Sequence, residues 1–168
     1  MTIIVPRHPA RGASIAEIAK AAGLAVAQRS HRKQPMPDIG VYVADTLGEL
    51  GLIYRLASIA FMGGSLARHG GQNPIEAIRL GVPVLHGPHV WNFAEIYATL
   101  DAAHGAEEVP DETTLSVRLD AWLADPAARR VAADAATATV MELGGALERT
   151  LAALDPYLMQ LHLEEKAS

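Results

Sequence analysis

The chain has 168 residues, which fits one domain of ordinary size and excludes an enzyme with two full catalytic domains. Hydrophobic residues make up 50% of the sequence and charged residues 20%, so the chain can bury a core and global disorder is excluded. Cysteine is absent and the net charge is −5, which excludes disulfide scaffolds, thiolate sites and a basic, duplex-wrapping protein. No nucleic-acid partner is therefore expected.

Short apolar runs alternate with helical patterns along the chain. Strands are predicted at 2–5, 24–28, 39–44, 58–62, 82–86 and 107–109. Helices are predicted at 14–22, 46–57, 74–80, 92–103, 113–124 and from 126 onward, with a break at Gly144-Gly145 and a last helix opened by Asp155-Pro156. This alternation predicts an α/β fold, a Rossmann-like parallel sheet with helices on both faces. Ligands bind such sheets beyond the carboxyl ends of the strands, so the loops there are the candidate site.

The sequence contains no sign of a membrane span or a signal peptide. No apolar run reaches the roughly 18 residues that are needed to cross a bilayer. Pro6 and Arg7 interrupt the first apolar run after a few residues, which is too short for a secretory signal. A cytoplasmic protein is therefore expected.

Four predicted helix starts share the spacing of a capping box, in which a short polar side chain stands three residues before a glutamate. The pairs are Ser14 and Glu17, Thr46 and Glu49, Asn73 and Glu76, and Asn92 and Glu95. Helix initiation explains all four glutamates, and we expect no other role for Glu17 and Glu49.

The third of these starts follows a glycine-rich loop. A predicted strand ends in Gly63-Gly64-Ser65, and Gly70 to Asn73 lead into Pro74. Glycines let a ligand approach the backbone, and the following helix start offers N–H donors to an anion. Glu76 is placed to accept the hydroxyls of a ribose. The pattern indicates a phosphate or sugar nucleotide; a tight turn that requires glycine is the alternative.

Other groups carry weaker signals. Arg7, at a strand end, is suited to clamp a phosphate or carboxylate, and a plain surface arginine is the alternative. His69, His86 and His89 raise the question of a metal, but no cysteine or carboxylate pair completes a ligand set, so no metal site is predicted. No serine lies in a nucleophile elbow, so a hydrolase triad is not supported.

Several separated motifs, in one order and spacing, resemble the C-terminal half of the 3-deoxy-D-manno-octulosonic acid (Kdo) transferases. They are VPRHPAR (5–11), VADTLGELGLIYRLASIAFMGGSL (43–66), HGGQNPIEA (69–77) and VPVLHGPHVWNFAEI (82–96), and the resemblance runs on to residue 158. It implies the GT-B glycosyltransferase fold, with two Rossmann-like domains. It also implies inverting transfer of Kdo from CMP-Kdo to a lipid A precursor in lipopolysaccharide biosynthesis. It further implies that the reaction takes place at the cytoplasmic face of the Gram-negative inner membrane, with no metal and no other cofactor.

The resemblance also implies which residues bind the substrate. Arg7, with His8 beside it, is implied to contact the phosphate or the sugar acid of the donor. Glu76 is implied to hold the ribose, while Asn92 and Glu95 lie near the Kdo end. The donor pocket and the donors to the CMP phosphate are implied to come from Gly63, Gly64, Ser65, Gly71, Gln72 and Asn73.

Members of this family carry the catalytic base, the acceptor surface and the membrane anchor in an N-terminal domain. Residues 1–168 are therefore expected to be a single, N-terminally truncated donor-nucleotide-binding domain, with C-terminal helices over 144–168. This piece would lack the first strand of its sheet, contain no catalytic residue and be inactive alone. Loss of a central strand leaves the strands at 2–5 and 58–62 with unpaired edges, which favours self-association.

Two other readings stay open. One is a non-catalytic interaction module or subunit fragment. The other is a GT-B transferase or epimerase that uses a different sugar nucleotide.

Overall fold

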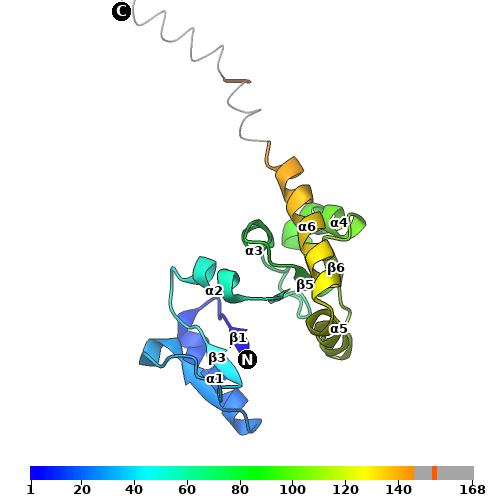
Figure 1. The fold of residues 1–168 in the computed structure, drawn as a ribbon. Helices are drawn as coiled ribbons and strands as arrows, with labels where there is room; N and C mark the ends of the chain where they lie inside the picture. Colours follow the sequence, from blue (N-terminus) through cyan, green and yellow to red (C-terminus); the bar gives the residue numbers. More distant parts are fainter. Residues whose placement is uncertain (146–152, 155–168) are drawn as a thin grey trace, which may run out of the picture. The chain divides into compact units, whose positions relative to one another are not determined.

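The computed structural model describes residues 1–145 and 153–154, and the chain divides into two compact units, Met1–Leu56 and Ala57–Ser168 (Figure 1). Each unit contains a three-stranded sheet in which every pairing is parallel. The predicted α/β class is confirmed. The predicted helix after Asp155-Pro156 lies outside the described residues, and a single domain over 1–168 stays a prediction.

In the first unit, β3 (Val41–Val43) lies between β1 (Thr2–Ile4) and β2 (Val26–Gln28). Helix α1 (Gly12–Ala21) connects β1 to β2, and α2 (Leu50–Leu56) follows β3. Because side chains alternate along a strand, each face of this sheet has its own core.

Helix α1 covers one face of the first sheet, where Ala16 and Ala19 pack against Val41 and Val43. The opposite face carries Tyr42 and Ala27, and Ile53 of α2 packs against it. Helices therefore lie on both faces, as the alternation of strands and helices predicted.

In the second unit, β5 (Val84–His86) lies between β4 (Ala60–Met62) and β6 (Ala106–Glu108). Its helices are α3 (Ile75–Arg79), α4 (Ala94–Ala102), α5 (Glu112–Ala124) and α6 (Pro126–Leu143).

The strand β5 is the core of the second unit, since Val84, Leu85 and His86 are all fully buried. Leu85 faces α5, where it packs with Trp122. His86 points to the other face of the sheet, where its ring lies 4.3 Å from that of Tyr97 on α4. Because side chains alternate along β5, one face of the sheet carries the apolar contact of Leu85 and the other face carries the polar side chain of His86.

Three of the predicted capping boxes are wrong. Helix α1 already begins at Gly12, so Ser14 lies inside the first turn and its hydroxyl donates to the Arg11 carbonyl at 2.9 Å. Helix α2 begins only at Leu50, because Gly48 turns the chain with a φ of 82°. A 3-10 turn over Trp91–Phe93 precedes α4, so Asn92 does not cap that helix.

The remaining start, at Asn73, is correct in part. The side-chain oxygen of Asn73 accepts a hydrogen bond from the Ile75 amide at 2.9 Å, which caps α3. No reciprocal bond from Glu76 occurs among the described residues, so its carboxylate takes no part in the cap. The spacing found the helix start, but not the full box.

Strands β1 and β4 each lie at an edge of their own sheet. These are the two strands for which unpaired edges were predicted. Within the described ranges, no helix is both long enough and apolar enough to cross a membrane.

Candidate functional site

The candidate site lies in the second unit and is formed by two loops, residues 63–73 after β4 and residues 87–92 after β5. The two strands are parallel neighbours, so their carboxyl ends meet at one edge of the sheet. This is where α/β sheets bind ligands.

Ser65 joins the two loops from inside. Its hydroxyl accepts a hydrogen bond from the Gly87 amide at 2.7 Å and donates to the Met62 carbonyl at 2.5 Å, while its own carbonyl accepts from the His89 amide at 2.9 Å. The residue is fully buried. Its polar groups therefore hold the backbone of the loops in place.

Asn92 joins the loops near the surface. Its backbone amide donates to the Gly70 carbonyl, and its side-chain amide donates to the His69 carbonyl, each at 3.2 Å. Together with the Ser65 bonds, these contacts fix the first loop to the second at both ends.

Glycine is required where the first loop turns. Gly64, Gly70 and Gly71 have φ values of 73°, 86° and 73°, a region that other residues rarely adopt. The Gly71 amide donates to the Gly64 carbonyl at 3.1 Å, which closes the loop on itself. The tight-turn reading is therefore correct for these positions, and it is compatible with a ligand site.

Two hydrogen bonds, one to the Gln72 carbonyl and one to the Asn73 side chain, hold the end of the first loop. Tyr97, which is buried on α4, donates its hydroxyl to the Gln72 carbonyl at 2.8 Å. Asn73 is exposed and its side chain caps α3, as described above. The two residues that follow the glycine pair therefore differ. The Gln72 carbonyl is hydrogen-bonded to a buried side chain, whereas Asn73 is exposed to solvent.

Three of the predicted site residues in this unit, Gly63, Glu76 and Glu95, are exposed to solvent. A Cβ added at Gly63 would meet no atom within 4 Å. The Glu76 and Glu95 side chains are exposed, and neither carboxylate has a hydrogen bond or an ion pair among the described residues. Trp91, in the second loop, is 55% exposed.

Arg7 and His8 belong to the first unit, where they follow β1 and are exposed. The structure therefore brings together the predicted residues of the second unit, while Arg7 and His8 stay a prediction of the sequence.

Comparisons with known proteins place this arrangement in a family. No protein-family model matches the chain. The chain is 43% identical to a 3-deoxy-D-manno-octulosonic acid transferase of Bordetella pertussis and 37% identical to one of Haemophilus influenzae; each match covers 94% of this chain and 37% of the relative. The chain thus spans little more than a third of the length of these relatives.

A solved structure decides the assignment. The C-terminal CMP-Kdo binding domain of WaaA from Acinetobacter baumannii is 33% identical, with a TM-score of 0.79, over 82% of this chain and 72% of that one. This chain belongs to the Kdo transferase family. The resemblance seen in the motifs is confirmed, and 82% of the chain matches that C-terminal domain.

One residue of this chain forms buried contacts that the sequence did not indicate. His86 is fully buried, and its two ring nitrogens face the Asp101 carboxylate at 3.0 Å and the Gly87 carbonyl at 2.8 Å. Burial by itself lowers the pKa of His86, but the bonds to Asp101 and to the Gly87 carbonyl outweigh it and the pKa is raised. The i, i+4 spacing of Tyr97 and Asp101 on one helix face is the signal that would have pointed to this cluster.

The histidines of the two loops do not gather into a ligand set. His86 uses both ring nitrogens for the contacts just described, and the His89 ring lies 5.9 Å from the Trp91 ring. In the part of the chain that the structure describes, no group of three or more His, Cys, Asp or Glu side chains is placed to hold a metal ion.

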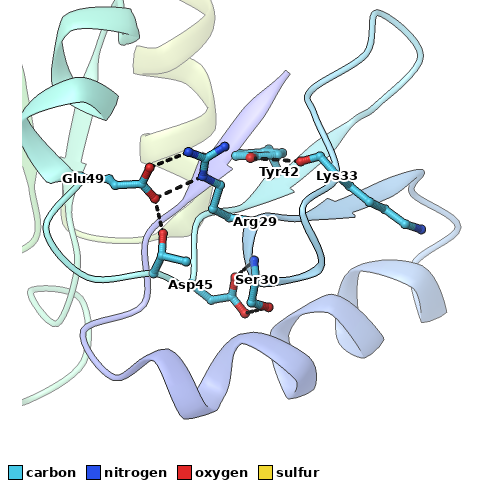
Figure 2. A network of polar contacts seen from close by, with 7 residues as sticks. Arg29, Ser30, Lys33, Tyr42, Asp45 and Glu49 are labelled. Atoms are coloured by element: carbon cyan, nitrogen blue, oxygen red, sulfur yellow. Dashed lines mark hydrogen bonds and ion pairs between the residues drawn. The ribbon is translucent and has the colours of Figure 1, made fainter.

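In the first unit, the buried carboxylate of Asp45 accepts several hydrogen bonds just after the carboxyl end of β3 (Figure 2). Its carboxylate accepts from the Gln28 side chain at 2.6 Å, and from the Ser30 amide and hydroxyl at 2.9 and 2.8 Å. Burial raises the pKa of Asp45, but the combined effect of these hydrogen bonds is larger and opposite. The pKa of Asp45 therefore lies below its ordinary value. Asp45 therefore ties the end of β2 to the end of β3.

Glu49 has a partner that the capping pattern did not predict. Its carboxylate forms an ion pair with Arg29, with an Nη2 to Oε1 distance of 2.5 Å, and also accepts from the Thr46 hydroxyl (Figure 2). The hydrogen bonds from Arg29 and Thr46 lower the pKa of Glu49 to about 2. We expected no role for Glu49 beyond helix initiation, and that prediction is wrong.

Proposed function

We propose that this chain is the donor-binding domain of a glycosyltransferase that transfers Kdo from CMP-Kdo to a lipid A precursor. The similarity to a solved domain that is described as CMP-Kdo binding carries this proposal, at 33% identity over 82% of the chain. In it, the loops at 63–73 and 87–92 bind the CMP part of the donor.

The geometry of the second unit supports this assignment. Gly63 leaves open space at the end of β4, so a ligand can approach the backbone there. The exposed Glu76 carboxylate has two oxygens that can accept from the hydroxyls of a ribose. Gly71, Gln72 and Asn73 lie between these two features and are assigned to the CMP phosphate.

The proposal extends to the remaining predicted residues and to features outside this unit. Arg7 and His8 contact the phosphate or sugar acid of the donor, and Asn92 and Glu95 lie near its Kdo end. The catalytic base comes from an N-terminal domain, transfer inverts the anomeric centre without a metal, and the enzyme works at the cytoplasmic face of the inner membrane.

The first test is binding of CMP to the whole chain, measured by isothermal titration. Saturable binding at millimolar CMP or below is expected, with weaker binding of UMP and of UDP-sugars. Stronger binding of a uridine nucleotide would favour a related transferase or epimerase with another donor. No binding of any nucleotide by well-folded protein would overturn the proposal.

A Gly63→Leu variant tests the place of the ligand. The new side chain extends into space that holds no protein atom within 4 Å of its Cβ, so the free energy of unfolding stays close to that of the wild type. CMP affinity should fall by at least about tenfold because the side chain occupies the ligand's position. An unchanged affinity would exclude this loop as the site.

A Glu76→Ala variant tests the ribose contact. We expect CMP affinity to fall about tenfold through the loss of hydrogen bonds to the ribose hydroxyls. The matched control is Glu142→Ala, which removes an exposed glutamate from α6 in the same unit and should leave CMP affinity unchanged. Equal affinities for the two variants would leave Glu76 without a role in binding.

Self-association is a separate proposal, which rests on the edge positions of β1 and β4. Open strand edges pair readily with a second chain. Size-exclusion chromatography with light scattering should detect dimers whose share rises with protein concentration; a monomer at every concentration would exclude such pairing.

A further inference from the structure

Tyr97 and His86 form a buried pair directly beneath the loop that ends in Gln72 and Asn73. Tyr97 is 1% exposed, and its hydroxyl donates to the Gln72 carbonyl at 2.8 Å. The two residues are 25 positions apart in the sequence, so this bond ties α4 to the end of the loop. Neither Tyr97 nor His86 has a part in the proposed binding of the donor itself.

The direction of this bond determines where the next amide points. A trans peptide is planar, and its C=O and N–H point in opposite directions. The Gln72 carbonyl points inward to Tyr97, so the Asn73 N–H of the same peptide points away from the core. Asn73 is exposed, and within residues 1–145 and 153–154 its N–H donates to no protein acceptor. The loop thus presents an unpaired backbone donor at its surface.

The His86 ring packs against the Tyr97 ring. Its ring lies 4.3 Å from the Tyr97 ring at an interplanar angle of 47°. Both ring nitrogens face acceptors, the Asp101 carboxylate and the Gly87 carbonyl, an arrangement that favours a proton on each nitrogen. The ring thereby links α4 to the start of the second loop.

The charges around His86 favour this protonated state. Asp101 stands on α4, four residues after Tyr97, and Glu108 pairs with His86 across the neighbouring strand β6. On the other side, β4 places the uncharged Met62 opposite His86. Both acidic groups act to raise the pKa of His86, against the effect of its burial.

We propose that Tyr97 and His86 are positioning residues of the donor site, which turn the Gln72–Asn73 peptide so that the Asn73 N–H faces the anionic group of the nucleotide. This inference rests on the proposed function. Tyr97 orients the peptide through the hydrogen bond from its hydroxyl to the Gln72 carbonyl. His86 fixes the position of Tyr97 and of the second loop through its contacts with the Tyr97 ring, Asp101 and the Gly87 carbonyl.

A Tyr97→Phe variant of the whole chain tests the hydroxyl. It keeps the ring against His86 but releases the Gln72 carbonyl, so CMP should bind about three- to tenfold more weakly. The matched control is Tyr42→Phe: Tyr42 is also buried and also donates to a backbone carbonyl, that of Lys33 at 3.2 Å, but in the first unit. This control should bind CMP as the wild type does.

A pH profile tests His86 in a way that a general loss of stability would not imitate. In Asp101→Asn the carboxylate of residue 101 no longer raises the pKa of His86, and of the two acidic groups only Glu108 remains, so His86 loses its proton at a lower pH than in the wild type. The ratio of the two CMP dissociation constants should be largest in the pH range where only the wild-type ring is charged, and should fall on either side of it. Any titration that the substitution does not change cancels in the ratio.

Amide NMR spectra of the free protein provide a readout that needs no nucleotide. The Asn73 amide signal should shift or broaden in Tyr97→Phe and stay in place in Tyr42→Phe. Wild-type affinity and an unmoved Asn73 signal in Tyr97→Phe, or a flat ratio for Asp101→Asn, would overturn the inference while the proposed function stands. Failure of the wild type to bind CMP would instead overturn the proposed function, and this inference with it.

Discussion

The Gly87 amide donates to the Ser65 hydroxyl at 2.7 Å, and the two residues approach so closely that position 87 has no room for a side chain. A Cβ on Gly87 would lie 2.5 Å from the Leu66 nitrogen and from the Ser65 carbonyl oxygen. These are backbone atoms that cannot rotate away, so the contact between the two loops depends on glycine at this position.

A Gly87→Ala variant should therefore be destabilised by about 1–3 kcal/mol, because the loops must separate to admit the methyl group. Urea unfolding of the whole chain measures this. The matched control is Gly63→Ala, whose Cβ meets no atom within 4 Å and which should change the free energy of unfolding by no more than about 0.5 kcal/mol. Equal stabilities of the two variants would mean that the loops are not in contact at Gly87.

Asn73 offers a way to separate capping from binding. An Asn73→Asp variant keeps an oxygen that accepts from the Ile75 amide, so the free energy of unfolding should stay near that of the wild type. Its negative charge should repel the phosphate and lower CMP affinity about tenfold, with no change for uncharged cytidine. A parallel loss for cytidine would show that the substitution perturbs the loop itself and not the phosphate contact.

Asp45 should make the first unit sensitive to acid. An Asp45→Asn variant places an amide N–H₂ where Gln28 and Ser30 donate, which should cost about 1–3 kcal/mol at pH 7. The folded-state pKa is lowered, so the carboxylate stabilises the protein above its ordinary pKa of about 4, and this contribution is lost as the pH falls below it.

The difference in Tm between wild type and Asp45→Asn should accordingly shrink when melting is repeated below about pH 4. Asp38→Asn serves as the control, since Asp38 is exposed in the loop before β3 and should show no difference at either pH. A difference for Asp45→Asn that is independent of pH would argue against an ionised, hydrogen-bonded carboxylate.

The Arg29–Glu49 pair should be visible in a carboxyl titration by NMR. We expect Glu49 to titrate at about 2, and to return toward its ordinary value of 4.5 in an Arg29→Met variant. Because the folded-state pKa is lowered, the pair contributes its stability above the ordinary value and loses it as the pH falls toward 2. A midpoint near 4.5 in the wild type would mean that the ion pair does not form in solution.

The local features of this fold could be predicted from the sequence. Strand and helix positions follow from the period of the apolar residues, which is a property of short windows. Residues 24–28 show the limit of that approach, since β2 begins only at Val26. Glycine at positions 64, 70 and 71 indicated the loop correctly, because its turns need backbone angles that glycine adopts without strain.

Partners that are distant in the sequence could not be predicted in this way. Glu49 looked like a helix cap because Thr46 stands three residues before it, yet its charge is paired with Arg29, 20 residues away. His86 raised the question of a metal in the sequence, yet its buried ring is paired with the Asp101 carboxylate. Only the folded chain shows which of several possible acceptors a donor reaches.

The sequence by itself determined that the chain forms parallel strands and helices with a glycine-rich loop after the fourth strand, since local periodicity and backbone preference encode these features. The tertiary structure alone decided how the site is held: Ser65 against Gly87, 22 residues apart, and Tyr97 against Gln72, 25 residues apart. Buried polar groups must find hydrogen-bond partners, and packing of β5 and α4 determines which ones come within reach.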